Sequence, residues 1–198
     1  MFDKRLLKID RDSKYDFNKS NYLRLDANER VIPFSKKDIS FIKNKINNYY
    51  IQSYPTYRFS VAQILSKKEK INIDQITITP GADAVLKYIF EIISKKKGNI
   101  LSVYPTYGMI DVYSKIYNRK HIKISEQNLE KFLLKKSYKN IALVYIANPN
   151  SPSGKIISKD IILEIAKNSK RRNILFVIDE AYIEYSKNKS LKNLIKKK

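Results

Sequence analysis

Two carboxylates, Asp179 and Glu180, directly follow a run of strand-forming residues near the end of the chain, in "FVIDEAY". A carboxylate at the end of a buried strand costs free energy unless a partner group compensates for its lost hydration. A cationic ring nitrogen is one natural partner for Asp179. Because side chains alternate along a strand, we expect Glu180 to point the other way and to pair or cap structurally.

Three other segments carry candidate binding groups at the ends of predicted strands. Gly81 precedes a predicted helix whose free N–H groups suit a phosphate, although strand-glycine-helix turns are also common without a ligand. Tyr107 in "YPTYG" is placed to stack on a planar ring, or else belongs to the core or its rim. The loop "NPNSPSG", residues 148–154, brings polar side chains to the sheet edge or serves only as a strand-to-helix turn.

The elements that must position these groups alternate between short apolar segments and segments of helical periodicity. The predicted strands cover 75–80, 99–105, 120–124, 140–150 and 173–182. The predicted helices cover 36–50, with Ser35 as N-cap, then 60–71, 82–96, 107–118, 126–136 and 158–170. Several strands are apolar on both faces, so we predict an α/β fold with a mostly parallel sheet flanked by helices. Ligands bind at the carboxyl ends of such strands, so the four segments should meet at one edge.

The net charge of +21 raises the alternative of a nucleic-acid-binding protein. The basic residues are mostly lysines spread along the whole chain, which favours a solvated surface, so we expect no specific nucleic acid as partner. No apolar run approaches the roughly 18 residues of a membrane span, and the first residues lack a signal-peptide core, so we expect a cytoplasmic protein. Cysteine is absent and His121 is the only histidine, so we expect no metal site and a surface position for His121.

Taken together and in order, the motifs make the chain resemble the fold-type I pyridoxal-phosphate aminotransferases, most of all the histidinol-phosphate aminotransferase group. The motifs that carry the resemblance are "LDANER" at 25–30, Tyr54-Pro55, "GADAVL" at 81–86, "YPTYGM" at 104–109, "ANPNSPSG" at 147–154 and "VIDEAYIEYS" at 177–186. They correspond to the N-terminal portion of the family. The resemblance implies an N-terminal arm and small-domain segment over residues 1–50 and an incomplete cofactor-binding large domain over residues 51–198.

The cofactor that the resemblance implies is pyridoxal 5'-phosphate, and it implies a role for each matching residue. Ala82 and Asp83 would contact the cofactor phosphate through backbone and side chain. Tyr107 would stack on the pyridine ring. Asp179 would hold the protonated ring nitrogen, and Tyr182 would approach the phenolic oxygen.

Other implied positions lie outside these segments or depart from the family. Tyr54 would reach the cofactor phosphate of the neighbouring subunit, because the family works as homodimers, and Asn28 would lie near the substrate. Where the family usually has an Asn that hydrogen-bonds the ring oxygen, this chain has Ser151. Serine is shorter, so a bridging water would have to replace the direct contact.

The activity that the resemblance implies is a transaminase of amino-acid biosynthesis. It would move an amino group between an amino compound, histidinol phosphate or a related amino acid, and a 2-oxo acid. The family's Schiff-base lysine lies downstream of "DEAY", and no lysine here stands in that context. We therefore expect a chain truncated before that lysine, without a catalytic residue of its own and inactive alone. The alternative is an inactive remnant that binds the cofactor weakly or pairs with a full-length partner.

Overall fold

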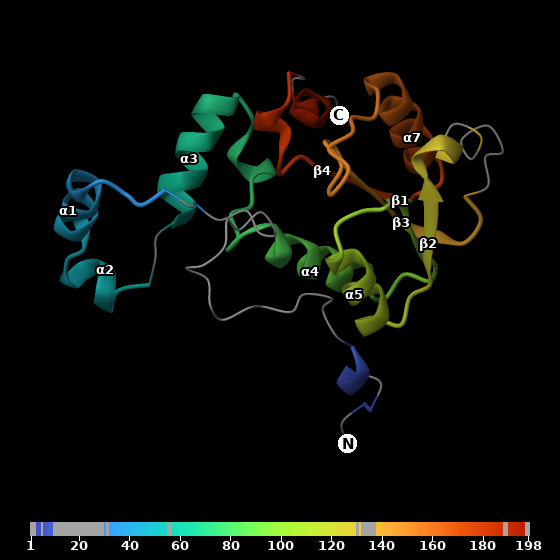
Figure 1. Cartoon of the computed structure of the whole chain (residues 1–198), viewed down its shortest axis with the longest axis horizontal. Coiled ribbons are helices and arrows are strands. Elements are labelled where there is room, and N and C mark those ends of the chain that lie inside the picture. The colour runs from blue at the N-terminus through green and yellow to red at the C-terminus, as the bar shows by residue number, and fades with distance from the viewer. Residues whose placement is uncertain are drawn as a thin grey trace. The chain divides into compact units, whose positions relative to one another are not determined.

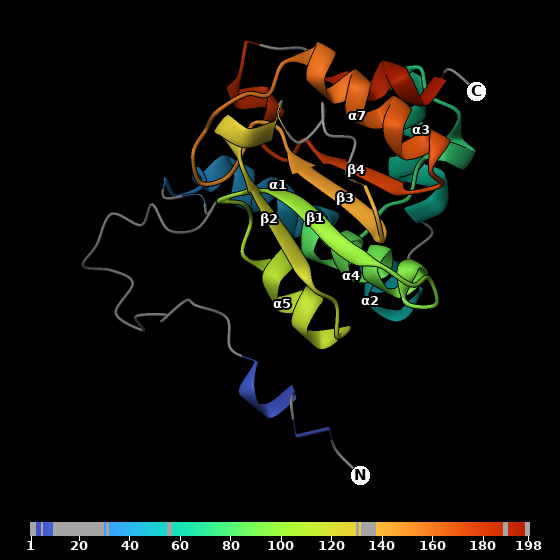
Figure 2. The same ribbon diagram turned by 90° about the vertical axis from the view of Figure 1, so that its right-hand side faces the viewer.

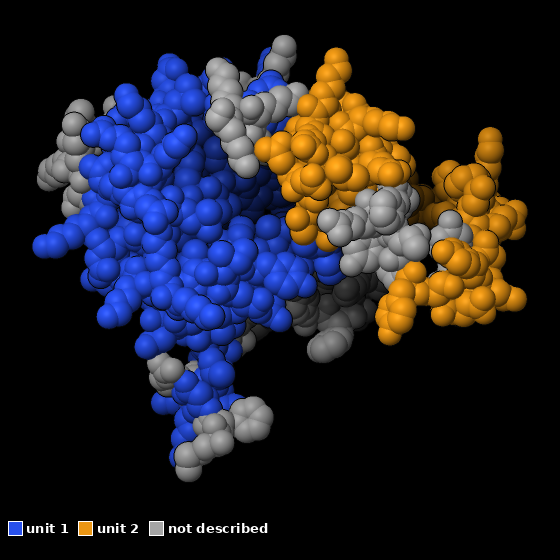
Figure 3. Space-filling view, turned by 180° about the vertical axis from the view of Figure 1, so that it is seen from behind, with its two compact units in different colours: residues 1–12, 79–198 blue, residues 13–78 orange. Residues whose placement is uncertain are grey.

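The computed structural model describes residues 3–4, 6–9, 30, 32–54, 57–129, 131, 138–187 and 190–196. The chain divides into two compact units, coloured separately in Figure 3. Unit 1 comprises Met1–Asp12 with Thr79–Lys198, and unit 2 comprises Ser13–Ile78. The domain division predicted near residue 50 stays a prediction. No helix of the described ranges combines the length and apolar character needed to cross a membrane.

The regular secondary structure in the described part of unit 2 is helical. It contains α1 (Lys36–Lys45), α2 (Asn48–Gln52), α3 (Tyr57–Glu69) and the 3-10 turn η3 (Ile73–Gln75). The predicted N-cap is confirmed, because the Ser35 hydroxyl oxygen accepts a hydrogen bond from the Asp38 N–H at 3.1 Å. The single helix predicted over 36–50 is wrong, since Ile46 takes an extended conformation that ends α1.

The strand predicted over 75–80 is also wrong. Residues 73–75 form η3, and residues 76–79 are irregular. A β-branched run becomes a strand only when a neighbouring strand satisfies its N–H and C=O groups. No described residues pair with this segment, since the sheet comprises four other strands.

Unit 1, whose elements are labelled in Figure 1, is built on a four-stranded, all-parallel sheet, and Figure 2 shows the strand order β2-β1-β3-β4. The strands are β1 (Asn99–Tyr104), β2 (His121–Ser125), β3 (Ile141–Ala147) and β4 (Leu175–Asp179). The helices are α4 (Ala82–Ile93), α5 (Met109–Ile116) and α7 (Lys159–Arg171), with 3-10 turns η1 (Leu6–Lys8), η4 (Glu126–Asn128), η5 (Ile183–Tyr185) and η6 (Leu191–Lys196). The helix predicted over 126–136 lies largely outside the described residues. The predicted α/β fold with a parallel sheet is confirmed.

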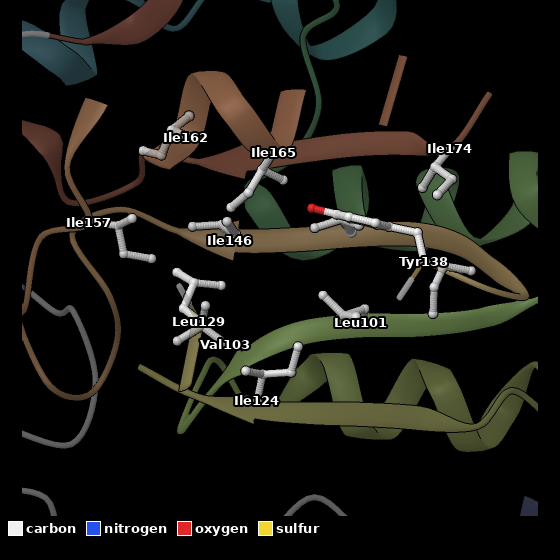
Figure 4. Close-up of a cluster of buried hydrophobic side chains, with 12 residues drawn as sticks. Leu101, Val103, Ile124, Leu129, Tyr138, Ile146, Ile157, Ile162, Ile165 and Ile174 are labelled. Atoms are coloured by element: carbon white, nitrogen blue, oxygen red, sulfur yellow. The ribbon is translucent and has the colours of Figure 1, made fainter. Parts of the chain in front are cut away.

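Helices cover both faces of the sheet, α7 on one and α4 with α5 on the other (Figure 2). On the α7 face, Val144 and Ile146 of β3 pack with Ile162 and Ile165 in the cluster drawn in Figure 4.

On the opposite face a second cluster contains Leu86, Phe90 and Ile93 of α4, Ile110 of α5, and Leu143 and Tyr145 of β3. Every residue of β3 is buried, as expected for the apolar run at 140–150.

The surface position expected for His121 is wrong, because its side chain is only 6% exposed. Its Nε2 lies 2.7 Å from the hydroxyl of Ser102 on β1, and its Nδ1 lies 2.6 Å from Oδ1 of Asp111 on α5. Lys123 donates to the other oxygen of Asp111 at 2.7 Å. The neutral ring satisfies both contacts when Nδ1–H donates to Asp111 and Nε2 accepts from Ser102.

The acid stability of the fold depends on this network. Burial lowers the pKa of His121 below its ordinary value, although Asp111 opposes the shift. The unfolded chain therefore binds a proton at His121 before the folded chain does, and stability is lost as pH falls through the ordinary histidine range, about 6.5. The pKa of Asp111 is pushed up by burial, but hydrogen bonds from Lys123 and His121 outweigh this effect and lower it, so further stability is lost in stronger acid.

We predict that the free energy of unfolding falls between pH 7 and pH 5, by at most the roughly 1.4 kcal/mol per pH unit that one proton allows. His121→Gln should show a flatter profile over this range, because glutamine does not titrate. Urea unfolding at several pH values measures both proteins. Parallel profiles for the wild type and the variant would contradict the assignment.

Candidate functional site

The carboxyl ends of β1, β3 and β4 meet at one edge of the sheet, as the topology predicts. The backbone N–H of Asn148, just past β3, donates to the carbonyl of Asp179 at the end of β4 at 2.8 Å. The Asn150 side chain donates through Nδ2 to the carbonyl of Pro105, just past β1, at 2.8 Å. These two hydrogen bonds join three of the predicted segments.

The fourth segment, the start of α4, is joined through Asp83. The Tyr107 hydroxyl donates to Asp83 Oδ1 at 2.7 Å, and the Tyr113 hydroxyl donates to the Asp83 carbonyl at 3.2 Å. All four segments singled out in the sequence are therefore connected by hydrogen bonds at this edge. The predicted convergence is confirmed, whereas the roles of the individual residues stay predictions.

The Asp179 carboxylate is held at both of its oxygens. The Tyr145 hydroxyl donates to Oδ2 at 2.7 Å, and the Ala181 N–H donates to Oδ1 at 3.0 Å. Glu180, next along the chain, is used structurally as expected. It accepts hydrogen bonds from the Ser190 hydroxyl and, at 2.7 Å, from the Leu191 N–H at the start of η6.

The N-terminus of α4 presents backbone N–H groups without a side-chain cap. Gly81, its N-cap, has φ of +84°, which a glycine adopts at little cost, and the space where a Cβ would stand is open. Ala82 follows and is exposed. The Asp83 carboxylate accepts from Tyr107 and has no hydrogen to donate to an anion. The backbone, rather than the Asp83 side chain, is thus what this turn offers to a phosphate.

The loop after β3 is held by its asparagines. The buried Oδ1 of Asn148 accepts from the Ile157 N–H at 2.9 Å. Both Nδ2 hydrogens of Asn150 are engaged, by the Pro105 carbonyl and, at 3.0 Å, by the Ser153 hydroxyl. Ser151, the residue after Asn150, is half-exposed in the turn. The Asn150 amide therefore has no N–H left to substitute for the amide that position 151 lacks.

The remaining predicted residues are less constrained. Tyr182 is half-buried at the start of η5, with its ring centroid 6.3 Å from that of Tyr185. Tyr54 in unit 2 is 96% exposed. Asn28 lies outside the described residues.

Two residues at the site escaped the sequence-based prediction. Tyr145 is fully buried in β3, yet its hydroxyl reaches a candidate binding residue. A tyrosine within an otherwise aliphatic strand was the available signal, because a buried hydroxyl needs a partner. Asn150 joins the loops after β1 and β3, but nothing in the local sequence identifies a bond to Pro105, 45 residues away.

The sequence matches the family described as aminotransferase class I and II over residues 12–195. It is 29% identical over 177 residues to histidinol-phosphate aminotransferase of Pelagibacter ubique, covering 87% of this chain and 48% of that protein. It is 33% identical over 191 residues to histidinol-phosphate aminotransferase of Flavobacterium psychrophilum, covering 93% of this chain and 50% of that protein. The chain thus spans about half the length of the curated relatives it matches.

Solved structures share the fold. Histidinol-phosphate aminotransferase from Clostridium acetobutylicum aligns with a TM-score of 0.60 at 24% identity, covering 81% of this chain and 47% of that chain. Cystalysin from Treponema denticola, which contains a pyridoxal 5'-phosphate cofactor, aligns with a TM-score of 0.52 at 20% identity, covering 72% and 38% of the two chains. The aligned part of this chain thus corresponds to about two fifths to one half of these two structures.

We predict that Asn148→Ala lowers the free energy of unfolding by about 1–3 kcal/mol, because it leaves the buried Ile157 N–H without its acceptor. The matched control is Asn128→Ala, which removes an exposed asparagine bonded to the Ser125 hydroxyl and should cost less than about 0.5 kcal/mol. Urea unfolding measures both. Equal losses would show that the Asn148 side chain does not hold this loop.

Proposed function

The chain belongs to the family of class I and II aminotransferases, and on that premise we propose that it serves the transfer of an amino group between an amino compound and a 2-oxo acid. Pyridoxal 5'-phosphate is the cofactor of this family. Histidinol phosphate or a related amino compound is the proposed donor, because the relatives at 29% and 33% identity bear that name. A cytoplasmic homodimer is part of the same proposal.

The hydrogen-bonded meeting of the strand ends is the observation that carries the proposal. The edge combines three kinds of group: uncapped N–H groups at the start of α4, the half-buried ring of Tyr107, and the carboxylate of Asp179. These suit a phosphate, a flat aromatic ring and a protonated ring nitrogen, in that order. The residues present therefore fit pyridoxal 5'-phosphate.

When bound, the cofactor supplies an aromatic ring that withdraws electrons from the carbon bearing the amino group. Asp179 would hold the proton on the ring nitrogen, which maintains that withdrawal. Tyr107 would cover one ring face, and its bond to Asp83 fixes where its hydroxyl lies. The backbone N–H groups of Ala82 and Asp83 would bind the phosphate, and Tyr182 would orient the phenolic oxygen.

The proposal extends to three further residues. Ser151 would face the phenolic oxygen side of the ring through a shorter side chain than the family's usual asparagine. Tyr54 would serve the site of a neighbouring subunit, which accords with its 96% exposure in this chain. Asn28 would lie near the substrate.

A second candidate keeps cofactor binding without turnover. These residues would then bind the cofactor weakly or pair with a full-length partner. The observation that favours it is that the groups joined at this edge, namely the N–H groups of α4, Tyr107 and Asp179, are all suited to binding the cofactor. Both candidates require the edge to bind the cofactor, so a binding measurement tests what they share.

The decisive ligand is pyridoxamine 5'-phosphate, the aminated form of the cofactor. It has no aldehyde, so it cannot react with the surface amines of this lysine-rich chain. We predict that the purified chain binds pyridoxamine 5'-phosphate saturably, and calorimetry measures the affinity. Asp179→Asn should weaken it by about ten- to a hundredfold, because a charge-assisted hydrogen bond is lost. Asp160→Asn, on the exposed start of α7, is the control and should change the affinity less than about twofold. An absence of binding by the wild type, or equal affinities for all three proteins, would refute the proposal.

The departure at position 151 allows a gain-of-function test. Ser151→Asn restores an amide donor beside the ring oxygen and should tighten pyridoxamine 5'-phosphate binding by about fivefold, the equivalent of one neutral hydrogen bond. Ser94→Asn adds the same side chain at the exposed far end of α4 and should have no effect. Unchanged or weaker binding by Ser151→Asn would place this turn away from the ring oxygen.

A further inference from the structure

Tyr145 is among the largest fully buried side chains of the described chain, and its hydroxyl is bonded to a candidate binding group. It lies in the middle of β3, between β1 and β4. A buried phenol that made only apolar contacts would lose the hydration of its hydroxyl without compensation. Here the Asp179 carboxylate provides that compensation at 2.7 Å.

The parallel register explains why these two side chains meet. Ala147 of β3 pairs with Asp179 of β4, and Tyr145 pairs with Val177. Leu143, Tyr145 and Ala147 belong to the cluster beneath α4 and α5, which also includes Leu175 and Val177 of β4. By alternation along β4, Asp179 lies on this same face. The long phenol of Tyr145 can therefore reach forward to the carboxylate at the strand end.

The two hydrogen bonds to Asp179 restrict the rotation of its carboxylate. The Tyr145 hydroxyl donates a hydrogen bond to Oδ2 from within the sheet, and the Ala181 N–H donates one to Oδ1 from the following turn. Each carboxylate oxygen has two lone-pair directions, so one direction on each oxygen remains for another donor. With both partners in place, the open directions are fixed relative to the sheet.

The phenol is also a permanent donor. Burial, reinforced by the negative charge of Asp179 and by the nearby Tyr107 and Asp83, raises the pKa of Tyr145 far above its ordinary value. A histidine in the same place would titrate near neutral pH and exchange donor for acceptor roles. The tyrosine keeps its proton, so it remains the donor in its contact to Asp179.

We propose that Tyr145 is a positioning residue that holds the Asp179 carboxylate in the orientation needed to accept a hydrogen bond from a protonated ring nitrogen. This inference rests on the proposed function, because it assumes that Asp179 faces the cofactor ring. Tyr145 itself is enclosed in the sheet and acts only through Asp179.

A double-mutant cycle tests this role. Affinities for pyridoxamine 5'-phosphate are measured for the wild type, Tyr145→Phe, Asp179→Asn and the double variant. Tyr145→Phe removes one oxygen atom and should weaken binding by about tenfold. In the Asp179→Asn background the same change should cost less than about twofold, because the group on which Tyr145 acts is already altered.

Tyr138→Phe is the matched control. Tyr138 is also buried, but it belongs to the cluster on the opposite face of the sheet and stacks near Arg172, with the guanidinium carbon 5.0 Å from its ring centroid. Loss of its hydroxyl should leave the affinity within about twofold. Ring-labelled pyridoxamine 5'-phosphate adds a readout that stability alone does not move: the ¹⁵N resonance of the bound ring nitrogen should shift in Tyr145→Phe and not in Tyr138→Phe.

A second measurement needs no change at position 145. In the wild type, the bonded hydroxyl proton of Tyr145 should give a slowly exchanging ¹H resonance that moves when pyridoxamine 5'-phosphate binds. In Asp179→Asn that ligand-induced movement should be lost. If the hydroxyl resonance of Tyr145 in the wild type does not move when pyridoxamine 5'-phosphate binds, the inference is overturned, even if Tyr145→Phe did not fold.

The outcomes separate this inference from the proposed function. If the wild type does not bind pyridoxamine 5'-phosphate, both are overturned. If the wild type binds and Tyr145→Phe matches it in affinity and nitrogen resonance, only the role of Tyr145 is overturned. If Tyr145→Phe lowers the affinity equally in the wild type and in the Asp179→Asn background, the role of Tyr145 is also refuted, because Tyr145 would then not act through Asp179.

Discussion

The parallel pairing of β3 with β4 is the constraint on which the candidate site depends. It places Ala147 opposite Asp179 and the Asn148 N–H on the Asp179 carbonyl. A slip of one residue would turn Asp179 to the α7 face and separate it from Tyr145. Phe176 and Ile178 pack against the cluster under α7, and Leu175 and Val177 against the cluster under α4 and α5. A slip would exchange these side chains between two closely packed clusters and would turn the Asp179 charge toward apolar residues, so packing on both faces resists it. The location of the carboxylate is thus a consequence of core packing.

The loops at this edge are ordered by internal hydrogen bonds between segments far apart in the chain. Asn150 joins the loop after β3 to the loop after β1, and Tyr107 joins that loop to the start of α4. A displacement of one loop is therefore transmitted to its neighbours. This arrangement favours a binding edge whose geometry exists before a ligand arrives, which lowers the entropic cost of binding.

Ser102, His121 and Asp111 are hydrogen-bonded in the order of a hydrolytic triad, but their surroundings indicate a structural role. Ser102 is fully buried beneath α5, so no substrate reaches its hydroxyl. The three side chains instead join β1, β2 and α5 by hydrogen bonds. The sequence alone predicts a surface position for this solitary histidine, which opens the short strand at 120–124. The helix that covers it comes from earlier in the chain, and its position was not visible in that local pattern.

The sequence by itself determined the α/β class, the helices α4, α5 and α7, and the strand ends that carry Asp179, Tyr107 and Asn148, because periodicity, glycine and proline act over a few residues. The match to class I and II aminotransferases was likewise contained in the order of the motifs. Only the tertiary structure decided that residues 76–79 remain irregular, that His121 is enclosed and that Tyr145 holds Asp179. These outcomes depend on which distant segments lie side by side, and the free energy of a buried hydrogen bond depends on its partner rather than on its neighbours in sequence.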